Sequence, residues 1–273
     1  MLASGQSLLL IGCGKMGGAL LSGWLDGGLD VQAVQVVEPF AAAAQALSAK
    51  GVNVRESVEA VPDAFAPAVV VLAVKPQQMD PVIEACARFM GPETVFLSIA
   101  AGKSIGYFEA KLGAAAAVVR AMPNTPAAVG RGISVLVGNA RANEAQRATS
   151  GRLLSAVGEV AWIEDEALMD PVTAVSGGGP AYVFLLIETL AQAGVEAGLP
   201  AELAMQLSRV TVTGAGELAR LSDQPAARLR ENVTSPGGTT LEALKVLMAP
   251  DGLQALMTRA IAEATRRSRE LDA

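Results

Sequence analysis

A glycine-rich stretch near the N-terminus has the residue types and the spacing of an anion-binding turn. The sequence of Leu8–Gly17 is LLLIGCGKMG, an apolar run that leads into Gly12, Gly14 and Gly17. Glycine allows a tight turn, and the free backbone N–H groups at the start of a following helix point into that turn. In dinucleotide-binding proteins the second glycine lets the backbone approach a pyrophosphate, and the third lets helix and strand pack closely. The spacing therefore predicts a phosphate-binding turn; the alternative is an ordinary glycine turn between buried elements.

The elements around this turn have the order that a nucleotide-binding unit needs. The apolar run before it is typical of a buried strand, and Met16–Asp26 has apolar residues at helical spacing. A second apolar run, Ala33–Val37, leads to Glu38, which lies about 20 residues beyond Gly17, where a carboxylate would hydrogen-bond an adenosine ribose. Strand, turn, helix, strand and acid in this order favour a dinucleotide site over a chance match.

The composition excludes several kinds of protein. The chain has 273 residues, 51% of them apolar, and a formal net charge of −6, which is the wrong sign for a nucleic-acid footprint. The longest apolar stretch, Ala64–Val74, contains Pro67 and is too short to span the ~30 Å of a bilayer core. Two cysteines cannot build a disulfide framework, so we expect a cytoplasmic protein. From the net charge and the short apolar stretch we expect that it binds neither nucleic acid nor membrane. The chain has no histidine, which excludes histidine-dependent hydride transfer, histidine triads and most zinc sites.

Strand and helix patterns alternate as far as Ile163, after which only helical patterns follow. The alternation predicts an α/β fold with a doubly wound, mostly parallel sheet of the Rossmann type. We expect a dinucleotide-binding domain over residues 1–163 and an all-helical domain over residues 164–273. The strands expected after Glu38 are Val52–Val54, Val69–Val74, Val95–Ile99, Ala117–Ala121, Ile133–Val137 and Glu159–Ile163. The expected helices are Ala41–Lys50, Pro81–Met90, Ser104–Leu112, Glu144–Val157 with Asn143 as its N-cap, Glu166–Val175, Pro180–Gly198, Ala201–Leu221, Leu241–Met248 and Gly252–Leu271.

Loops that follow the expected strands should lie beside the glycine turn. In a doubly wound sheet the loops at the carboxyl ends of the strands share one edge, where ligands bind. Lys75-Pro76, Ala100–Lys103 and Met122–Pro126 should therefore meet near this turn, where they could hold the nicotinamide half of a dinucleotide. Each loop taken alone is equally well explained as a simple turn.

The helical half contains two glycine-rich interruptions at the starts of helices. Ser176–Tyr182 starts the long central helix, and Asn232–Thr240 starts a later one. Free N–H groups at such a helix start suit a carboxylate, although plain helix capping explains Ser235 and Thr240 as well. These helices carry many small residues and few large ones, so we expect two copies of the chain to interlock and share a core.

Six motifs occur in order over nearly the whole chain: IGCGKMG, AVKPQ, SIAAG, RAMPNTP, SGGGPAYVF and LRENVTSPGGTTLEAL. Together they resemble the pyrroline-5-carboxylate reductase family, which reduces 1-pyrroline-5-carboxylate to L-proline with NAD(P)H. The last motif is specific, unlike the glycine turn. The resemblance implies a homodimer with an all-helical dimerisation domain, which the family commonly builds into larger rings.

The resemblance also implies a role for each matching residue. The substrate carboxylate would bind backbone N–H groups of Gly238, Thr239 and Thr240 in the turn that begins at Ser235. The Thr240 hydroxyl would lie at the ring nitrogen as the catalytic group, with Asn232 and Glu166 nearby. The residues that would contact the cofactor are Ile11, Gly12, Cys13, Gly14, Lys15, Met16, Glu38, Ala73, Val74, Lys75, Pro76, Ile99, Ala100 and Ala101.

A chain without histidine suits the reduction of an imine. A cyclic imine can arrive protonated, and hydride then converts the cation into a neutral amine, so no strong acid is required and positioning is the main task. Two other interpretations remain open. A 3-hydroxyacid or 6-phosphogluconate-type dehydrogenase would need a lysine on the central helix, and Ser176–Gly198 contains none; a non-catalytic NAD(P)-binding sensor would keep the turn and lack the chemistry.

Glu38 also bears on the choice of cofactor. The family mostly prefers NADPH and tends to carry small polar or basic residues after the second strand, whereas Glu38 would repel a 2′-phosphate. We therefore predict a shift toward NADH, although Arg55 or Lys50 could still accommodate the phosphate.

Overall fold

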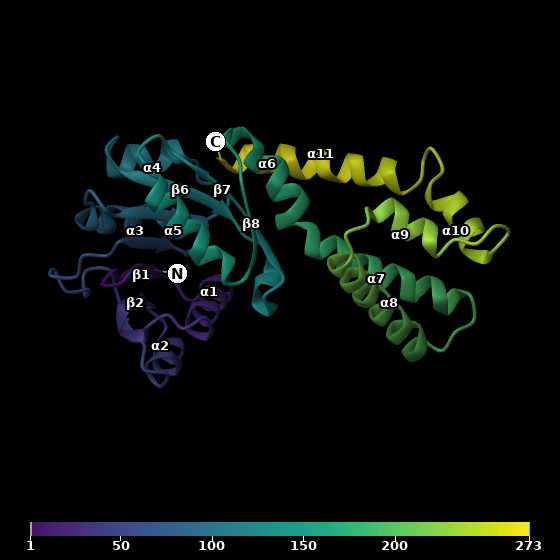
Figure 1. Ribbon diagram of the computed structural model, residues 1–273, viewed down its shortest axis with the longest axis horizontal. Helices are drawn as coiled ribbons and strands as arrows, with labels where there is room; N and C mark the ends of the chain where they lie inside the picture. Colours follow the sequence, from purple (N-terminus) through teal and green to yellow (C-terminus); the bar gives the residue numbers. More distant parts are fainter. Residues whose placement is uncertain (1, 273) are drawn as a thin grey trace. The chain divides into compact units, whose positions relative to one another are not determined.

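The computed structural model describes residues 2–272, which divide into two compact units (Figure 1). The first unit runs to Gly177 and takes in the end of the last helix from Thr265 onward; the second is Gly178–Ala264. The boundary falls beyond residue 164 because the segment before Gly177 packs into the first unit, where Met169 and Ala174 are buried.

An eight-stranded sheet forms the centre of the first unit, with the strand order β3-β2-β1-β4-β5-β6-β7-β8. The first six strands are parallel, β7 runs antiparallel to β6, and β8 is parallel to β7. Leu10 of β1 pairs with Val36 of β2 on one side and with Val71 of β4 on the other. The strand order therefore reverses beside β1, and such a switch point is where open α/β sheets bind ligands. The strands are β1 (Leu8–Ile11), β2 (Val34–Val37), β3 (Asn53–Arg55), β4 (Val69–Leu72), β5 (Val95–Ser98), β6 (Ala117–Met122), β7 (Gly132–Gly138) and β8 (Gly158–Trp162).

Helices cover both faces of this sheet, so the predicted doubly wound α/β fold is confirmed (Figure 1). Buried side chains of α1 and α5 form one apolar cluster with the sheet, and those of α3 and α4 form a second cluster on the opposite face. The helices of this unit are α1 (Lys15–Asp26), α2 (Ala41–Ser48), α3 (Met79–Cys86), α4 (Ile105–Leu112), α5 (Glu144–Ser155) and α6 (Met169–Val172).

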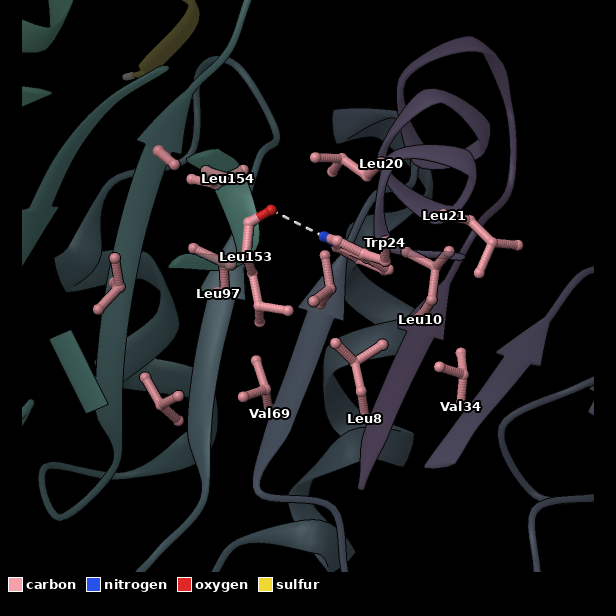
Figure 2. Packing of buried hydrophobic residues seen from close by; sticks show 14 of the residues in the cluster. Leu8, Leu10, Leu20, Leu21, Trp24, Val34, Val69, Leu97, Leu153 and Leu154 are labelled. Carbon is pink, nitrogen blue, oxygen red and sulfur yellow. Dashed lines mark hydrogen bonds between the residues drawn. The ribbon is translucent and has the colours of Figure 1, made fainter. Parts of the chain in front are cut away.

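Trp24 fixes α1 on the sheet. Its ring is fully buried over β1, near Leu8 and Leu10, and its indole N–H donates to the Leu153 carbonyl oxygen of α5 at 2.8 Å (Figure 2). A buried indole N–H needs such a partner. Because α1 begins at the glycine turn, this packing gives the turn a rigid support.

Capping residues set the starts of two helices that the sequence predicts. The Asn143 side chain accepts from the Gln146 backbone N–H, and the Gln146 side chain accepts from the Asn143 backbone N–H, which is a complete capping box at α5. The Ser104 hydroxyl accepts from the Tyr107 N–H at 3.2 Å and caps α4. Both starts agree with the sequence prediction to within one residue.

One expected strand and one expected helix differ clearly from the structure, and one observed helix was not expected. The strand expected over Val69–Val74 ends at Leu72, because the next residues leave the sheet to form the loop at its edge. The helix expected over Glu166–Val175 is broken into a 3-10 turn, the short helix α6 and a π-helical turn over Thr173–Gly177. The helix α9 (Ala226–Asn232) was not predicted, because three of its seven residues are charged and Leu229 is its single large apolar residue, so it shows no apolar periodicity.

In the described residues the second unit contains helices and no strands, as predicted. Gly194 of α7 lies against Ala204 of α8, so small residues let these two helices approach closely. Many large apolar side chains on both helices are nevertheless exposed, among them Phe184 and Leu186 on α7 and Val210 and Leu218 on α8. The helices are α7 (Gly179–Glu196), α8 (Ala201–Leu221), α9, α10 (Thr239–Leu247) and α11 (Leu253–Asp272), the last of which ends in the first unit.

One helical stretch, Glu166–Glu196, is long and apolar enough to cross a membrane when judged by length and composition alone. Few of its residues are buried within the described chain. An exposed apolar helix of this kind is also typical of a surface that packs against a second copy of the chain.

Candidate functional site

The glycine turn has the geometry that its sequence predicts. Gly12 follows β1 with a φ of 88°, which residues other than glycine rarely adopt. A Cβ at Gly12 would lie 2.9 Å from the Ala73 carbonyl oxygen, and a Cβ at Gly17 would collide with the carbonyl oxygen of Gly12. The two glycines therefore allow a tight turn and let α1 pack directly against the end of β1.

Gly14 leaves the start of α1 open. It is the N-cap residue, no side chain caps the helix there, and a Cβ at Gly14 would meet no atom within 4 Å. The first N–H groups of a helix have no acceptor within the helix, and partial positive charge collects around them. Lys15 and Met16, the first two helical residues, add their N–H groups to this open end. The arrangement fits a pyrophosphate group.

Glu38 binds the glycine turn from the end of β2. Its side chain is buried; Oε2 accepts the Cys13 backbone N–H at 3.0 Å, and Oε1 accepts the Phe40 backbone N–H at 3.0 Å. The carboxylate predicted to contact a ribose therefore has a second task, because it also fixes the turn. Burial raises the pKa of the neighbouring Cys13 thiol to about 11, and the charge of Glu38 adds to the shift, so this thiol is neutral at physiological pH.

A cavity of about 570 Å³ lies along the turn, at the carboxyl ends of β1, β2 and β4. It is also lined by residues that the sequence reasoning did not single out, including Phe40, Glu56 and Glu59. Lys15 lines a different, larger groove of about 880 Å³ between α1 and α5. The predicted cofactor residues that line the smaller cavity are Ile11, Gly12, Cys13, Gly14, Glu38, Ala73, Val74 and Lys75.

Of the remaining predicted cofactor residues, Met16 lies in the first turn of α1, and the others follow β4 and β5. Pro76 begins a 3-10 turn directly after Lys75, and Ile99, Ala100 and Ala101 follow the last residue of β5. The Ala73 N–H donates to the Ile11 carbonyl oxygen at 2.8 Å, and the Ile99 N–H donates to the Leu72 carbonyl oxygen at 3.1 Å. These bonds hold the loops after β1, β4 and β5 next to one another at one edge of the sheet, as predicted.

The turn predicted to bind a carboxylate lies in the second unit, at the start of α10. Gly237 has a φ of 70°, and Gly238 is the N-cap residue, with no side-chain cap from Ser235 or Thr240. The Gly238 N–H donates to the Ser235 carbonyl oxygen at 3.0 Å and so closes the turn. The N–H groups of Thr239 and Thr240 have no acceptor in the part of the chain that the structure describes. Two of the three predicted backbone donors are therefore open, and the third holds the turn.

Asn232 and Glu166 make contacts within their own units. Asn232 ends α9, and its Nδ2 donates to Gln224 Oε1 at 2.9 Å. Glu166 lies in the first unit, where its Oε1 accepts from Arg120 Nη1 and from the Ile105 backbone N–H, each at 2.8 Å. The sequence reasoning missed Arg120, although an arginine within an apolar strand is a signal for a buried partner.

Comparisons with known proteins give a match for each part of the chain. Residues 166–271 match a family model described as pyrroline-5-carboxylate reductase dimerisation, and residues 7–102 match one described as NADP oxidoreductase, coenzyme F420-dependent. A pyrroline-5-carboxylate reductase of Pseudomonas aeruginosa is 43% identical over 266 residues, which cover 97% of this chain and 96% of that protein. The chain belongs to the pyrroline-5-carboxylate reductase family.

Solved structures of this family have the same fold over their whole length. A pyrroline-5-carboxylate reductase from Coxiella burnetii superposes with a TM-score of 0.91 at 34% identity, covering 98% of this chain and 99% of that one. A Plasmodium falciparum pyrroline carboxylate reductase with NADP bound has a TM-score of 0.83 at 30% identity, and each chain is fully covered. The family and fold predicted from the sequence are thus confirmed. The dimerisation match includes the Asn232–Thr240 turn, and the other match includes the glycine turn and Ile99–Ala101.

Proposed function

We propose that this chain is a pyrroline-5-carboxylate reductase: it transfers a hydride from NAD(P)H to the C=N bond of 1-pyrroline-5-carboxylate and forms L-proline, the last step of proline biosynthesis. One combined observation carries the proposal. The chain is similar over its full length to reductases of this name, and α1 and α10, the helices at the two predicted ligand sites, both begin without a side-chain cap. Since the chain has no histidine, the positive charge on the reacting nitrogen comes from a protonated imine and not from an imidazole.

The first unit holds the cofactor, which supplies the hydride when bound. The backbone donors at the start of α1 bind the pyrophosphate, with Gly12 and Gly14 allowing its approach. Glu38 contacts the adenosine ribose while it fixes the turn. The uncapped end of α1 and the open side of Gly14 support this assignment. The residues that line the nicotinamide and its ribose are Ala73, Val74, Lys75, Pro76, Ile99, Ala100 and Ala101.

The turn before α10 binds the substrate. The N–H groups of Thr239 and Thr240 bind the carboxylate, as their open state at a helix N-terminus favours. Ser235 and Gly238 shape the turn, because the Gly238 N–H donates to the Ser235 carbonyl oxygen. The Thr240 hydroxyl lies at the ring nitrogen, and Asn232 lies nearby. A direct substrate contact by Glu166 stays a prediction.

NADH is the cofactor that this cavity favours. Glu38, Glu56 and Glu59 line it, against one lysine, Lys75, among the described residues. Hydrogen bonds from the backbone and from Ser57 hold the pKa of Glu59 below its usual value, so this carboxyl is ionised at neutral pH. A 2′-phosphate would add negative charge to this surface, whereas the ribose hydroxyl of NADH adds none.

The working form is a homodimer, or a ring of such dimers, in the cytoplasm. Residues 1–163 bind the dinucleotide, and residues 164–273 bind the substrate and dimerise. The exposed apolar side chains of α7 and α8 support this, because a second copy would bury them. The net charge of −6 gives the chain no attraction to nucleic acid or to an anionic membrane. Light scattering at micromolar concentration tests the assembly; a monomer would refute it.

The decisive experiment adds 1-pyrroline-5-carboxylate to the enzyme with NADH and, separately, with NADPH, and follows oxidation of the cofactor. We expect turnover with both and a higher kcat/KM with NADH; a strong NADPH preference would refute the assignment to Glu38. Turnover of a 3-hydroxyacid but of no imine would favour the dehydrogenase interpretation, and binding without turnover would favour a sensor.

Thr240→Val tests the catalytic assignment. The variant keeps the backbone donor and loses the hydroxyl, so we expect kcat to fall about tenfold or more, in line with the loss of one hydrogen bond to the reacting group. Thr240→Ser, which keeps a hydroxyl, serves as the control and should retain most activity. Equal kcat values for Thr240→Val and Thr240→Ser would show that the hydroxyl takes no part in the reaction.

A further inference from the structure

Arg120 carries a buried positive charge within an apolar strand. It lies near the end of β6 and is only 4% exposed, while its neighbours Val118 and Val119 are fully buried. A buried guanidinium requires a counter-charge, and Glu166 supplies one through the 2.8 Å contact between Arg120 Nη1 and Glu166 Oε1. The pair joins β6 to the segment that follows β8.

The same carboxylate oxygen holds the start of α4. Glu166 Oε1 accepts the backbone N–H of Ile105, the first residue of that helix, at 2.8 Å. Ser104 caps the third helical residue, Tyr107, so Glu166 provides a second cap from a distant part of the sequence. A carboxylate at a helix N-terminus is also favoured by the helix dipole. The position of α4 therefore depends on a charge that Arg120 fixes from within the sheet.

The loop that directly precedes this helix is Ile99–Ser104, part of which lines the nicotinamide in the proposed function. We propose that Arg120 and Glu166 are positioning residues for the cofactor: their ion pair fixes the start of α4 and, through it, the loop Ile99–Lys103. The proposal rests on the proposed function for the role of this loop. It gives Glu166 a task that requires no contact with substrate.

Asp170 provides a matched control in the same segment. Its Oδ1 accepts the Ser268 hydroxyl at 2.8 Å, and its Oδ2 lies 3.6 Å from Arg269 Nε, so it holds the end of α11 and not α4. Asp170 is a largely buried carboxylate four positions after Glu166, also paired with an arginine. Loss of its charge disturbs the segment without touching the start of α4.

The test compares Glu166→Gln, the double variant Arg120→Met with Glu166→Gln, and Asp170→Asn, all in the full chain. NADH affinity is measured by titration of protein fluorescence, stability by urea unfolding, and the protection of the Ile105 amide by hydrogen exchange of fragments that contain the start of α4. For Glu166→Gln we expect an NADH Kd about tenfold higher and correspondingly faster exchange at Ile105, because the charge on the capping oxygen is lost. Asp170→Asn should leave both values within about twofold of the unmutated chain.

The double variant separates positioning from simple stabilisation. It removes the buried positive charge together with its partner, so its stability should recover relative to Glu166→Gln, while NADH affinity and Ile105 protection stay low. Recovery of affinity along with stability would overturn the proposal, and so would unchanged NADH binding in Glu166→Gln. An unmutated chain that binds NADH yet reduces no imine would refute the proposed function and leave this test of the loop unaffected.

Discussion

Because Glu38 fixes the glycine turn and is proposed to contact the ribose, we predict that its substitution lowers the stability of the protein and raises its preference for NADPH. The Glu38 carboxylate accepts hydrogen bonds from the backbone N–H groups of Cys13 and Phe40, each with an N–O distance of 3.0 Å. In Glu38→Ser the shorter side chain cannot reach these two groups. Hydrogen bonds to a charged acceptor contribute about 1.5 to 3 kcal/mol each. Because the adjoining cavity admits water to the freed donors, we take the lower limit for both bonds and expect a loss of about 3 kcal/mol. Glu38→Gln keeps one carbonyl oxygen and should lose about half of that.

The same substitutions should shift the enzyme toward NADPH. Removal of one negative charge beside the proposed site of the 2′-phosphate is worth about 1 to 2 kcal/mol at the dielectric of a partly exposed cleft, or about tenfold in the ratio of kcat/KM for NADPH to that for NADH. Urea unfolding followed by tryptophan fluorescence, which reports on the buried Trp24, measures the first effect. Steady-state rates with the two cofactors measure the second.

Glu56→Gln is the control, since Glu56 lines the same cavity but is exposed and makes none of the hydrogen bonds that fix the turn. It should leave stability unchanged within about 0.5 kcal/mol. The reasoning is refuted if Glu38→Ser is as stable as the unmutated chain, because the carboxylate would then not hold the turn. The predicted effect on cofactor choice is refuted if both Glu38 variants keep the ratio of kcat/KM for NADPH to that for NADH found in the unmutated chain.

Two further predictions follow from the glycine turn and from a buried thiol. Gly14→Val should fold normally, because its Cβ meets no atom within 4 Å, yet it should bind NADH about tenfold or more weakly. Gly17→Val, whose Cβ collides with the Gly12 carbonyl oxygen, should instead unfold at a lower temperature than the unmutated chain. Equal melting temperatures for the two variants would contradict this prediction. Burial raises the pKa of the Cys86 thiol from 9.0 to about 12, so the unfolded chain ionises first as pH rises, and stability is lost between those values. From pH 8 to pH 10 the unmutated chain should lose about 1.4 kcal/mol more than Cys86→Ala in urea unfolding, and equal losses would show that the thiol is not the cause.

The features that the sequence predicts well are those set by neighbouring residues. The glycine turn depends on steric limits at Gly12 and Gly17, and the α5 start depends on Asn143 and Gln146; each involves residues within a few positions of one another. The parallel order of strands follows from the alternation of elements and brings the loops after β1, β4 and β5 together. The glycine turn and the loops beside it were therefore predictable as structure, and their contacts with a cofactor stay a prediction.

The features that the sequence does not predict depend on tertiary contacts or on weak periodicity. The bond from Glu166 to Ile105 joins residues far apart in sequence, and no local pattern specifies it. The second task of Glu38 is also tertiary, because it depends on how closely β2 lies beside the end of β1. In α9 the i, i+3 pair of Arg228 and Glu231 and the preceding Pro225 were the available signals, and they are weaker than apolar periodicity.

Both ligand sites of the proposed reductase use the same physical device. The start of α1 in the first unit and the start of α10 in the second are each preceded by a glycine N-cap, and neither has a side-chain cap. A pyrophosphate and a carboxylate are both anions, so backbone N–H groups and the helix dipole suffice to bind them. Because the imine brings its own proton, no titrating side chain is then needed at the reacting atoms, and the absence of histidine costs the reaction nothing. It follows that activity should depend on backbone geometry at Gly14 and Gly238 more steeply than on any single ionisable residue.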